Sequence, residues 1–168
     1  MILYRDATPG DTAALARLGG DSFTQTFGHL YAPADLALFL AKHSAEAWAA
    51  ELADPAFAIR IAEDEKAMIG YAKLGPPQLP FTPSGTPAEL RQLYVLGPWH
   101  GAGVAAALME WVLATARERG ADELFLSVFT DNHRARKFYA RYGFEAVGTY
   151  SFMVGNHADE DIVMRLGL

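Results

Sequence analysis

The stretch from Tyr94 to Leu108 constrains the fold more than any other part of the chain, because it reads as a strand, a glycine turn and a helix in direct succession. Gly101 and Gly103 strip the turn of side chains, and the helix expected from Val104 begins with amides that lack partners within the helix. Such amides and the helix dipole favour an anion, and glycines let a phosphate approach the backbone. The stretch therefore predicts either an anion cradle or an ordinary tight turn, which glycine also serves.

Turn residues and apolar periodicity around this stretch predict alternating strands and helices. The expected strands are about 2–6, 57–63, 68–74, 89–96, 124–129, 145–154 and 161–166, and the expected helices are about 9–28, 33–40, 44–54, 104–120 and 132–143. Five prolines in 75–87 exclude a helix or a central strand there, so this segment is predicted to be a surface loop. Gly19 and Gly20 are expected to weaken or bend the first helix. The order of elements predicts an α/β fold in which a mixed sheet carries helices on both faces.

The composition narrows the classes of protein to consider. With 168 residues, 51% of them hydrophobic, the chain is predicted to be one domain, residues 1–168, with a sizeable core. The absence of cysteine excludes disulfides, thiol nucleophiles and cysteine-based zinc sites, and it favours a cytoplasmic location. The histidines lack metal-ligand spacing, so no metal is predicted. No apolar run has membrane-spanning length, and the net charge of -6 disfavours nucleic-acid and anionic-membrane partners while favouring cations.

A second segment gives the glycine turn a chemical context. It reads Asn132-His133-Arg134-Ala135-Arg136-Lys137-Phe138-Tyr139-Ala140-Arg141-Tyr142-Gly143-Phe144 and follows a predicted strand. Together with the turn His100-Gly101-Ala102-Gly103-Val104-Ala105, it closely resembles the GNAT superfamily of acetyl-coenzyme A-dependent N-acetyltransferases. The two segments match the family patterns (Arg/Gln)-x-x-Gly-x-(Gly/Ala) and Asn-x-x-Ala-x-x-x-Tyr-x-x-x-Gly-Phe. The resemblance covers about residues 57–150 and implies the GNAT fold, with a mostly antiparallel central sheet.

The resemblance also implies that acetyl-CoA is the cosubstrate and indicates which residues bind it. The implied cofactor-binding residues are Leu93, Val95, His100, Gly101, Ala102, Gly103, Val104, Ala105, Asn132, Ala135 and Phe138. Of these, Leu93 and Val95 would offer backbone hydrogen bonds to the pantetheine arm. His100 departs from the family, which usually has Arg or Gln there. Because backbone amides of 101–105 can hold the diphosphate, we expect binding to survive this change.

Acetyl transfer to an amine needs a neutral nucleophile, a stabilised oxyanion and a proton for the departing thiolate. A lysine-like amine of pKa about 10.4 is protonated at pH 7, and its deprotonation costs about 4–5 kcal/mol, so a nearby base assists. The resemblance favours Glu89 as that base, with His29 as a rival and an exposed strand-edge charge as the alternative for Glu89. It assigns the oxyanion to free amides near Val95 and the thiolate proton to Tyr139. Spacing alone instead makes Tyr139 a core aromatic.

The acceptor is less constrained. The aromatic segment 23–31 and the tail 152–164 resemble bacterial spermine/spermidine acetyltransferases, which makes Phe27, His29 and Tyr31 candidate substrate-binding residues. With the acidic charge, this favours a small cationic amine such as a polyamine, which would attack directly through a tetrahedral intermediate. Acetylation of a protein N-terminus or lysine, with 75–87 as part of a peptide groove, is one alternative, and a non-catalytic acyl-CoA sensor is another. Dimers are common in such folds, so a homodimer is a further expectation. The acidic residues 159–161 are predicted to form a solvated turn or, alternatively, a cation-attracting rim.

Overall fold

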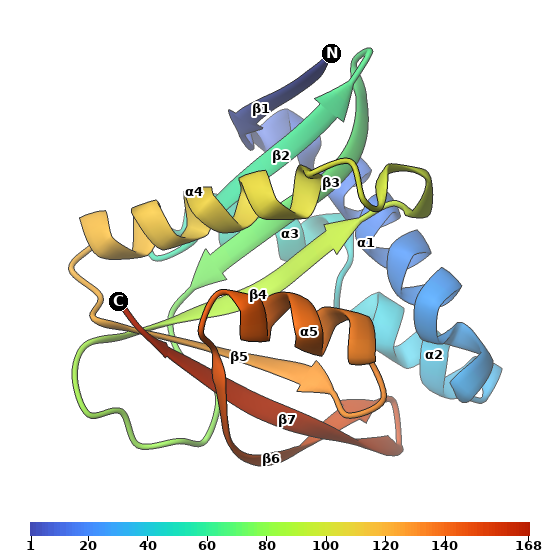
Figure 1. Cartoon of the computed structure of the whole chain (residues 1–168). Coiled ribbons are helices and arrows are strands. Elements are labelled where there is room, and N and C mark those ends of the chain that lie inside the picture. The colour runs from blue at the N-terminus through green and yellow to red at the C-terminus, as the bar shows by residue number, and fades with distance from the viewer.

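Seven strands form one sheet in the computed structural model of the chain, which describes residues 1–168 (Figure 1). Their order across the sheet is β1-β2-β3-β4-β5-β7-β6, and the pair β4–β5 is parallel while every other pair is antiparallel. The strands are β1 (Ile2–Asp6), β2 (Ala58–Asp64), β3 (Ala67–Gly75), β4 (Pro87–Val95), β5 (Glu123–Phe129), β6 (Glu145–Val154) and β7 (His157–Gly167). The predicted mixed, mostly antiparallel sheet is confirmed.

Helices cover both faces of this sheet, as predicted (Figure 1). They are α1 (Thr12–Phe27), α2 (Pro33–Ala41), α3 (Ala45–Ala53), α4 (Val104–Glu118) and α5 (His133–Arg141). Apolar side chains of α4 and α5 bury against one face, which we call the α4–α5 face. Those of α1 and α3 bury against the other, the α1–α3 face, and α2 packs beside β6. No helix combines the length and the apolar character that crossing a membrane requires.

Local sequence signals explain most of the helix ends. Ser44 Oγ accepts a hydrogen bond from the Ala47 amide at 3.3 Å, and Asn132 Oδ1 accepts one from the Ala135 amide at 3.3 Å, so both predicted caps are confirmed. Gly120, with φ of 84°, follows the last turn of α4 in the left-handed conformation expected of a helix stop. Segment 76–86 contains no helix or strand, in agreement with the loop that its prolines predict.

The helix α1 continues from Thr12 to Phe27 across the glycine pair, and a weakening or bend there stays a prediction. The reason for a glycine there is packing, because a Cβ on Gly19 would lie 2.7 Å from the hydroxyl oxygen of Tyr71. The strand β7 begins at His157, ahead of the predicted start at Asp161, so the acidic residues 159–161 lie within a strand and not in a solvated turn.

The strands β4 and β5 separate soon after they meet, as Figure 1 shows. They pair over three positions, the last being Glu89 with Phe125. Beyond this point β4 stays paired with β3 as far as Val95, while β5 stays paired with β7 as far as Phe129. The consequence is a gap in the middle of the sheet whose edges carry backbone groups without a strand partner.

Candidate active site

The glycine turn lies at the top of the gap, between β4 and α4. Gly101 and Gly103 have φ values of 83° and 82°, in the left-handed region that favours glycine. A Cβ at either position would meet nothing within 4 Å, so the surface above the turn is open. The amides of both glycines and of Val104 and Ala105 donate to no backbone group outside α4, and α4 offers them no acceptor one turn earlier. Of the predicted cofactor residues 101–105, all but Ala102, whose amide donates to the Trp99 carbonyl at 3.2 Å, therefore offer free donors to a ligand.

His100 and Arg134 meet beside this turn. The imidazole Nε2 of His100 lies 2.7 Å from the Val95 carbonyl oxygen, and Nη1 of Arg134 contacts its Nδ1. A guanidinium can only donate, so Nδ1 accepts and Nε2 carries the hydrogen that is donated to Val95. Arg134, at the start of α5, thus brings a positive charge to the turn where residue 100 lacks one. Sequence reasoning missed Arg134, although it stands within the quoted α5 motif and at the amino end of the helix.

Tyr139 comes from α5 and lies on the α4–α5 face, where 9% of its surface is exposed. Its ring packs edge-on against Phe138 and Phe144, with centroid separations of 5.5 and 5.8 Å. Burial raises the pKa of Tyr139 and the nearby Tyr94 raises it further, so the phenol is protonated at neutral pH. The hydroxyl makes no hydrogen bond within the chain. It still reaches solvent, because the one fully buried side-chain atom without a hydrogen-bond partner is Nε of Arg60 and not the Tyr139 oxygen. The hydroxyl is therefore free to donate to a ligand.

The other predicted cofactor contacts line the same face. The side chains of Leu93 and Val95 pack against the core of the α4–α5 face, which leaves the backbone of this part of β4 at the gap. Ala135 and Phe138 are half-buried in the same layer. Asn132 caps α5 with its side-chain oxygen.

Glu89, the base predicted from the resemblance, lies where β4 and β5 part and is only 5% exposed. Its Oε1 accepts hydrogen bonds from the amides of Gln78 and Leu79, each at 3.0 Å. Its Oε2 lies 2.9 Å from Nε of Arg91. These donors use the carboxylate to anchor the proline-rich loop to β4, so the geometry supports a structural task and lends no support to a base.

The predicted acceptor residues lie at the junction of α1, α2 and the β6–β7 hairpin. Phe27 packs against Phe129 with a ring separation of 5.9 Å. The Tyr31 hydroxyl donates to Asp159, which also lies 3.2 Å from Nε2 of His157. His29, in the turn between α1 and α2, is exposed and takes part in no hydrogen bond or ion pair of the chain.

Two acidic residues that the sequence assigned to a solvated turn are buried on β7. Asp159 and Asp161 are 8% and 5% exposed, whereas Glu160 between them is exposed on the opposite face. Asp161 pairs with Phe129 of β5, which places it on the α1–α3 face. Burial raises the pKa of Asp161 to about 7 against the effect of a Ser127 hydrogen bond. The sequence offers no alternation of charged and apolar residues here, because the three acidic residues 159–161 follow one another directly.

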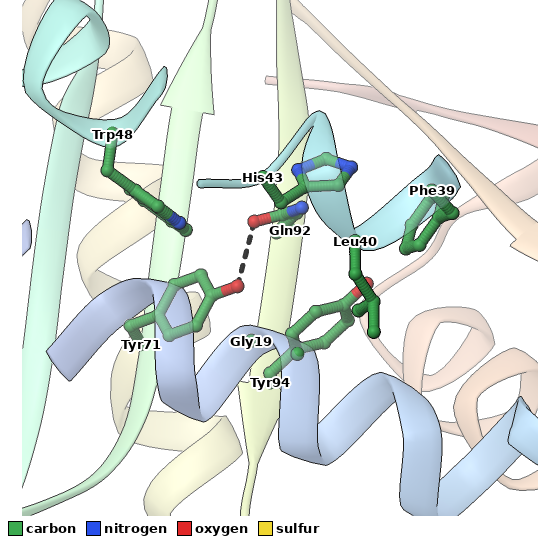
Figure 2. Close-up of a pocket in the computed structure, with 9 residues that line it drawn as sticks. Gly19, Phe39, Leu40, His43, Trp48, Tyr71, Gln92 and Tyr94 are labelled. Atoms are coloured by element: carbon green, nitrogen blue, oxygen red, sulfur yellow. Dashed lines mark hydrogen bonds between the residues drawn. The ribbon is translucent and has the colours of Figure 1, made fainter. Parts of the chain in front are cut away.

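A small cavity on the same face lies behind Tyr94 (Figure 2). It is lined by Gly19, Gly20, Phe39, Leu40, His43, Trp48, Tyr71, Gln92 and Tyr94. Its volume of about 10 Å³ suits a single water molecule and is too small for an amine substrate. Figure 2 shows the Tyr71 hydroxyl pointing at Gln92, whose Oε1 accepts its hydrogen bond at 2.8 Å. Burial and the nearby Lys73 lower the pKa of His43, which favours its uncharged form. The cavity therefore places no added positive charge beside Tyr94.

Comparison with known proteins gives this geometry a family. A model of the acetyltransferase (GNAT) family matches residues 21–144. An uncharacterised N-acetyltransferase of Mycobacterium bovis is 38% identical over 155 residues, which span 92% of this chain and 96% of that protein. A further uncharacterised N-acetyltransferase, from Lactobacillus delbrueckii subsp. lactis, is 25% identical over 162 residues, or 94% of this chain and 92% of the relative.

Solved structures agree. The PaiA N-acetyltransferase of Thermoplasma acidophilum, in complex with coenzyme A, has a TM-score of 0.80 at 18% identity over 100% of this chain and 99% of its own; at that identity the likeness concerns the fold. The ribosomal-protein-alanine N-acetyltransferase of Brucella melitensis has a TM-score of 0.74 at 26% identity over 99% of each chain. With the family match and the mycobacterial relative, these findings show that the chain belongs to the GNAT family and is an acetyl-CoA-dependent N-acetyltransferase.

Proposed function

We propose that this N-acetyltransferase acetylates the primary amine of a small cationic molecule, such as a polyamine. The observation that carries the proposal is the pair of buried carboxylates, Asp159 and Asp161, on the α1–α3 face beside the gap between β4 and β5. Aromatic rings of Phe27 and Tyr31 adjoin them, and such rings favour a cation as well. The pocket chemistry therefore suits an ammonium group, in keeping with the net charge of -6.

The donor would bind on the α4–α5 face. The free amides of the glycine turn fit a diphosphate, and Arg134 adds the charge that His100 lacks. The backbone of Leu93 and Val95 is positioned for the pantetheine arm. The His100 imidazole would have to leave the Val95 carbonyl before that carbonyl can accept from an amide of the arm. When bound, acetyl-CoA supplies the reactive thioester.

The gap then joins the two halves of the reaction. The amine reaches the carbonyl carbon from the α1–α3 face, and backbone amides at the edge of β4 near Val95 stabilise the oxyanion. Tyr139, protonated and with a free hydroxyl, gives its proton to the departing thiolate. Its burial keeps bulk water away from this proton transfer.

Substitution of Tyr139 by phenylalanine tests the acid role. We expect Tyr139→Phe to lower kcat by about 10²- to 10⁴-fold, the usual contribution of a general acid, while the Kd for acetyl-CoA changes less than about threefold. The matched control is Tyr142→Phe on the same helix, whose hydroxyl makes a long 3.5 Å contact to the Ala106 carbonyl. Unchanged turnover of Tyr139→Phe at saturating substrates would remove Tyr139 from the mechanism.

A thiol-release assay against a panel of amines tests the acceptor class. The panel holds spermidine, 1,4-diaminobutane, an aminoglycoside, single amino acids and an alanine-initiated peptide. We expect the small polycations to give the highest kcat/KM. The likeness to the ribosomal-protein-alanine enzyme makes a protein N-terminus the second candidate, and preference for the peptide would favour it. Tight acetyl-CoA binding with no release of thiol to any amine would overturn the enzyme assignment in favour of a sensor.

A further inference from the structure

Asp161 is a buried carboxylate without a cation. It is 5% exposed, and no lysine, arginine or histidine lies within ion-pair distance of it, although the chain forms such pairs at several other carboxylates. The one polar side chain that affects it is the neutral hydroxyl of Ser127 on β5, which leaves most of its acceptor capacity unused. Carboxylates with so little exposed surface are normally paired with a cation. The oxygens of Asp161 are not among the buried atoms that lack a partner, so they reach solvent and are open to an incoming ammonium group.

The position of Asp161 suits a ligand that enters the gap. It lies on β7, next to the part of β5 that has separated from β4. Phe129, the register partner of Asp161, packs against Phe27 of α1, and Tyr94 of β4 packs against the cluster formed by α1 and α3, so Asp161 and Tyr94 lie on the same face of the sheet. Tyr139 lies on the opposite, α4–α5 face. An acceptor nitrogen beside Asp161 would thus approach from the face opposite the proposed proton donor.

The other buried carboxylates near the gap are already occupied. Glu89 accepts two amide hydrogen bonds and pairs with Arg91. Asp159 accepts from the Tyr31 hydroxyl and pairs with His157. These contacts give Glu89 the task of holding the proline-rich loop, and they give Asp159 the task of joining the turn before α2 to β7. Of the three, Asp161 is the one without an ion-pair partner.

We propose that Asp161 is the general base of this acetyl transfer and accepts a proton from the ammonium group of the acceptor. The assignment rests on the proposed function. The neutral nitrogen then attacks the thioester carbonyl carbon, forming the C–N bond. The C–S bond breaks, Tyr139 protonates the thiolate, and the second proton lost by the nitrogen restores the phenol. The net products are the acetamide, coenzyme A as its thiol, and one proton on Asp161, which passes to solvent.

The surroundings of Asp161 tune it for this step. The titratable groups that face it are Asp159 on β7, Tyr150 on β6, Tyr94 on β4 and Tyr31 after α1. None of them brings a positive charge, so they do not stabilise the ionised form. A carboxylate with a pKa of about 7 is closer to an amine of about 10.4 than an ordinary aspartate is, and it still ionises near neutral pH.

The pH profile of an isosteric variant tests the base. With spermidine and 1,4-diaminobutane as acceptors, we expect wild-type kcat/KM to fall on the acid side with an apparent pKa near 7. Asp161→Asn should lose this limb and lower kcat at pH 7.5 by about 10²- to 10⁴-fold. Its Kd for acetyl-CoA, measured by calorimetry, should stay within about threefold of wild type, which also reports that the variant is folded.

Glu160→Gln is the matched control, because it removes the same charge one residue away on the exposed face of β7. It should keep both the rate and the acid limb. If Asp161→Asn retains them as well, or raises only KM, the base assignment is overturned while the proposed function stands. A wild type that acetylates no amine in the panel overturns the proposed function itself, and the two failures are thereby distinguished.

Discussion

At residue 100 the chain carries a histidine whose ring faces the Val95 carbonyl, and the nearest cation is Arg134. Because a charged hydrogen bond contributes about 1.5–3 kcal/mol, Arg134→Ala should weaken coenzyme A binding by about tenfold to a hundredfold. His100→Ala should change it less, since the backbone amides of the turn remain. Calorimetry measures both, with Lys137→Ala, an exposed cation on the same helix, as the control. If Lys137→Ala weakens coenzyme A binding as much as Arg134→Ala does, the loss comes from the change in net charge and not from a specific contact of Arg134.

Residues differ in how far the sequence alone could assign them. Tyr139 and the glycine turn sit within patterns of fixed spacing, so the resemblance located them. Arg134 was missed because its partner His100 lies 34 residues away in the sequence. Asp161 was missed because its burial depends on the fold, which the sequence alone does not show. The resemblance favours Glu89 as the base, but the sequence could not show that amides of the proline-rich loop donate hydrogen bonds to its carboxylate.

Among the elements, the junction between α2 and the β6–β7 hairpin borders the proposed acceptor site. At the hairpin turn Gly155 has φ of 58°, and a Cβ there would lie 2.5 Å from Cα of Asp35 on α2. The Asn156 amide also donates to Asp35 Oδ1 at 2.9 Å. The hairpin is therefore seated directly on α2, close to the Tyr31–Asp159 hydrogen bond that joins the same elements.

Gly155→Ala should push the hairpin away from α2. We expect KM for the amine to rise by at least about tenfold and stability to fall by about 1–3 kcal/mol, the usual cost of overpacking, with the Kd for acetyl-CoA within about threefold of wild type. Gly167→Ala is the control, because a Cβ there meets nothing within 4 Å. Steady-state kinetics and denaturant unfolding measure the two effects. A matching rise in the Kd for acetyl-CoA would show that the pockets are not separate.

Element ends were predictable where the signal is local. The Ser44 and Asn132 caps and the Gly120 stop act within one turn of the chain, and each was found where the sequence indicated it. The start of β7 was missed because acidic residues suggest solvent, whereas their burial depends on contacts made by Tyr31, before α2, and by β5. The reason for Gly19 was missed for the same kind of reason, since Tyr71 is brought to it by the fold.

At the scale of the whole molecule, acidic groups impose opposite pH dependences on stability. Hydrogen bonds from Ser84 and from the Gly85 amide, together with Arg165, lower the pKa of Glu123 to about 2, against the effect of its burial. Its contribution is present above the ordinary pKa of about 4.5 and is lost as the pH falls toward 2. Asp161 is the reverse, since its folded pKa of about 7 lies above its ordinary value of 3.8. Its folded form is favoured when protonated, so stability declines as the pH rises from about 4 to about 7.

Asp161→Asn should therefore stabilise the protein at high pH, although it removes the proposed base. A pKa raised by about three units corresponds to about 4 kcal/mol, so the free energy of unfolding of the variant should gain about 2–4 kcal/mol on wild type between pH 4 and pH 8.5. Denaturant titrations at these two pH values measure the gain. The pH dependence that Glu123 contributes is the same in both proteins and drops out of the difference. Glu160→Gln, which changes the net charge equally, should gain nothing. A gain that is absent in Asp161→Asn, or shared by Glu160→Gln, would mean that Asp161 bears no unpaired charge in the folded protein, because only a carboxylate held without a partner makes its own removal stabilising.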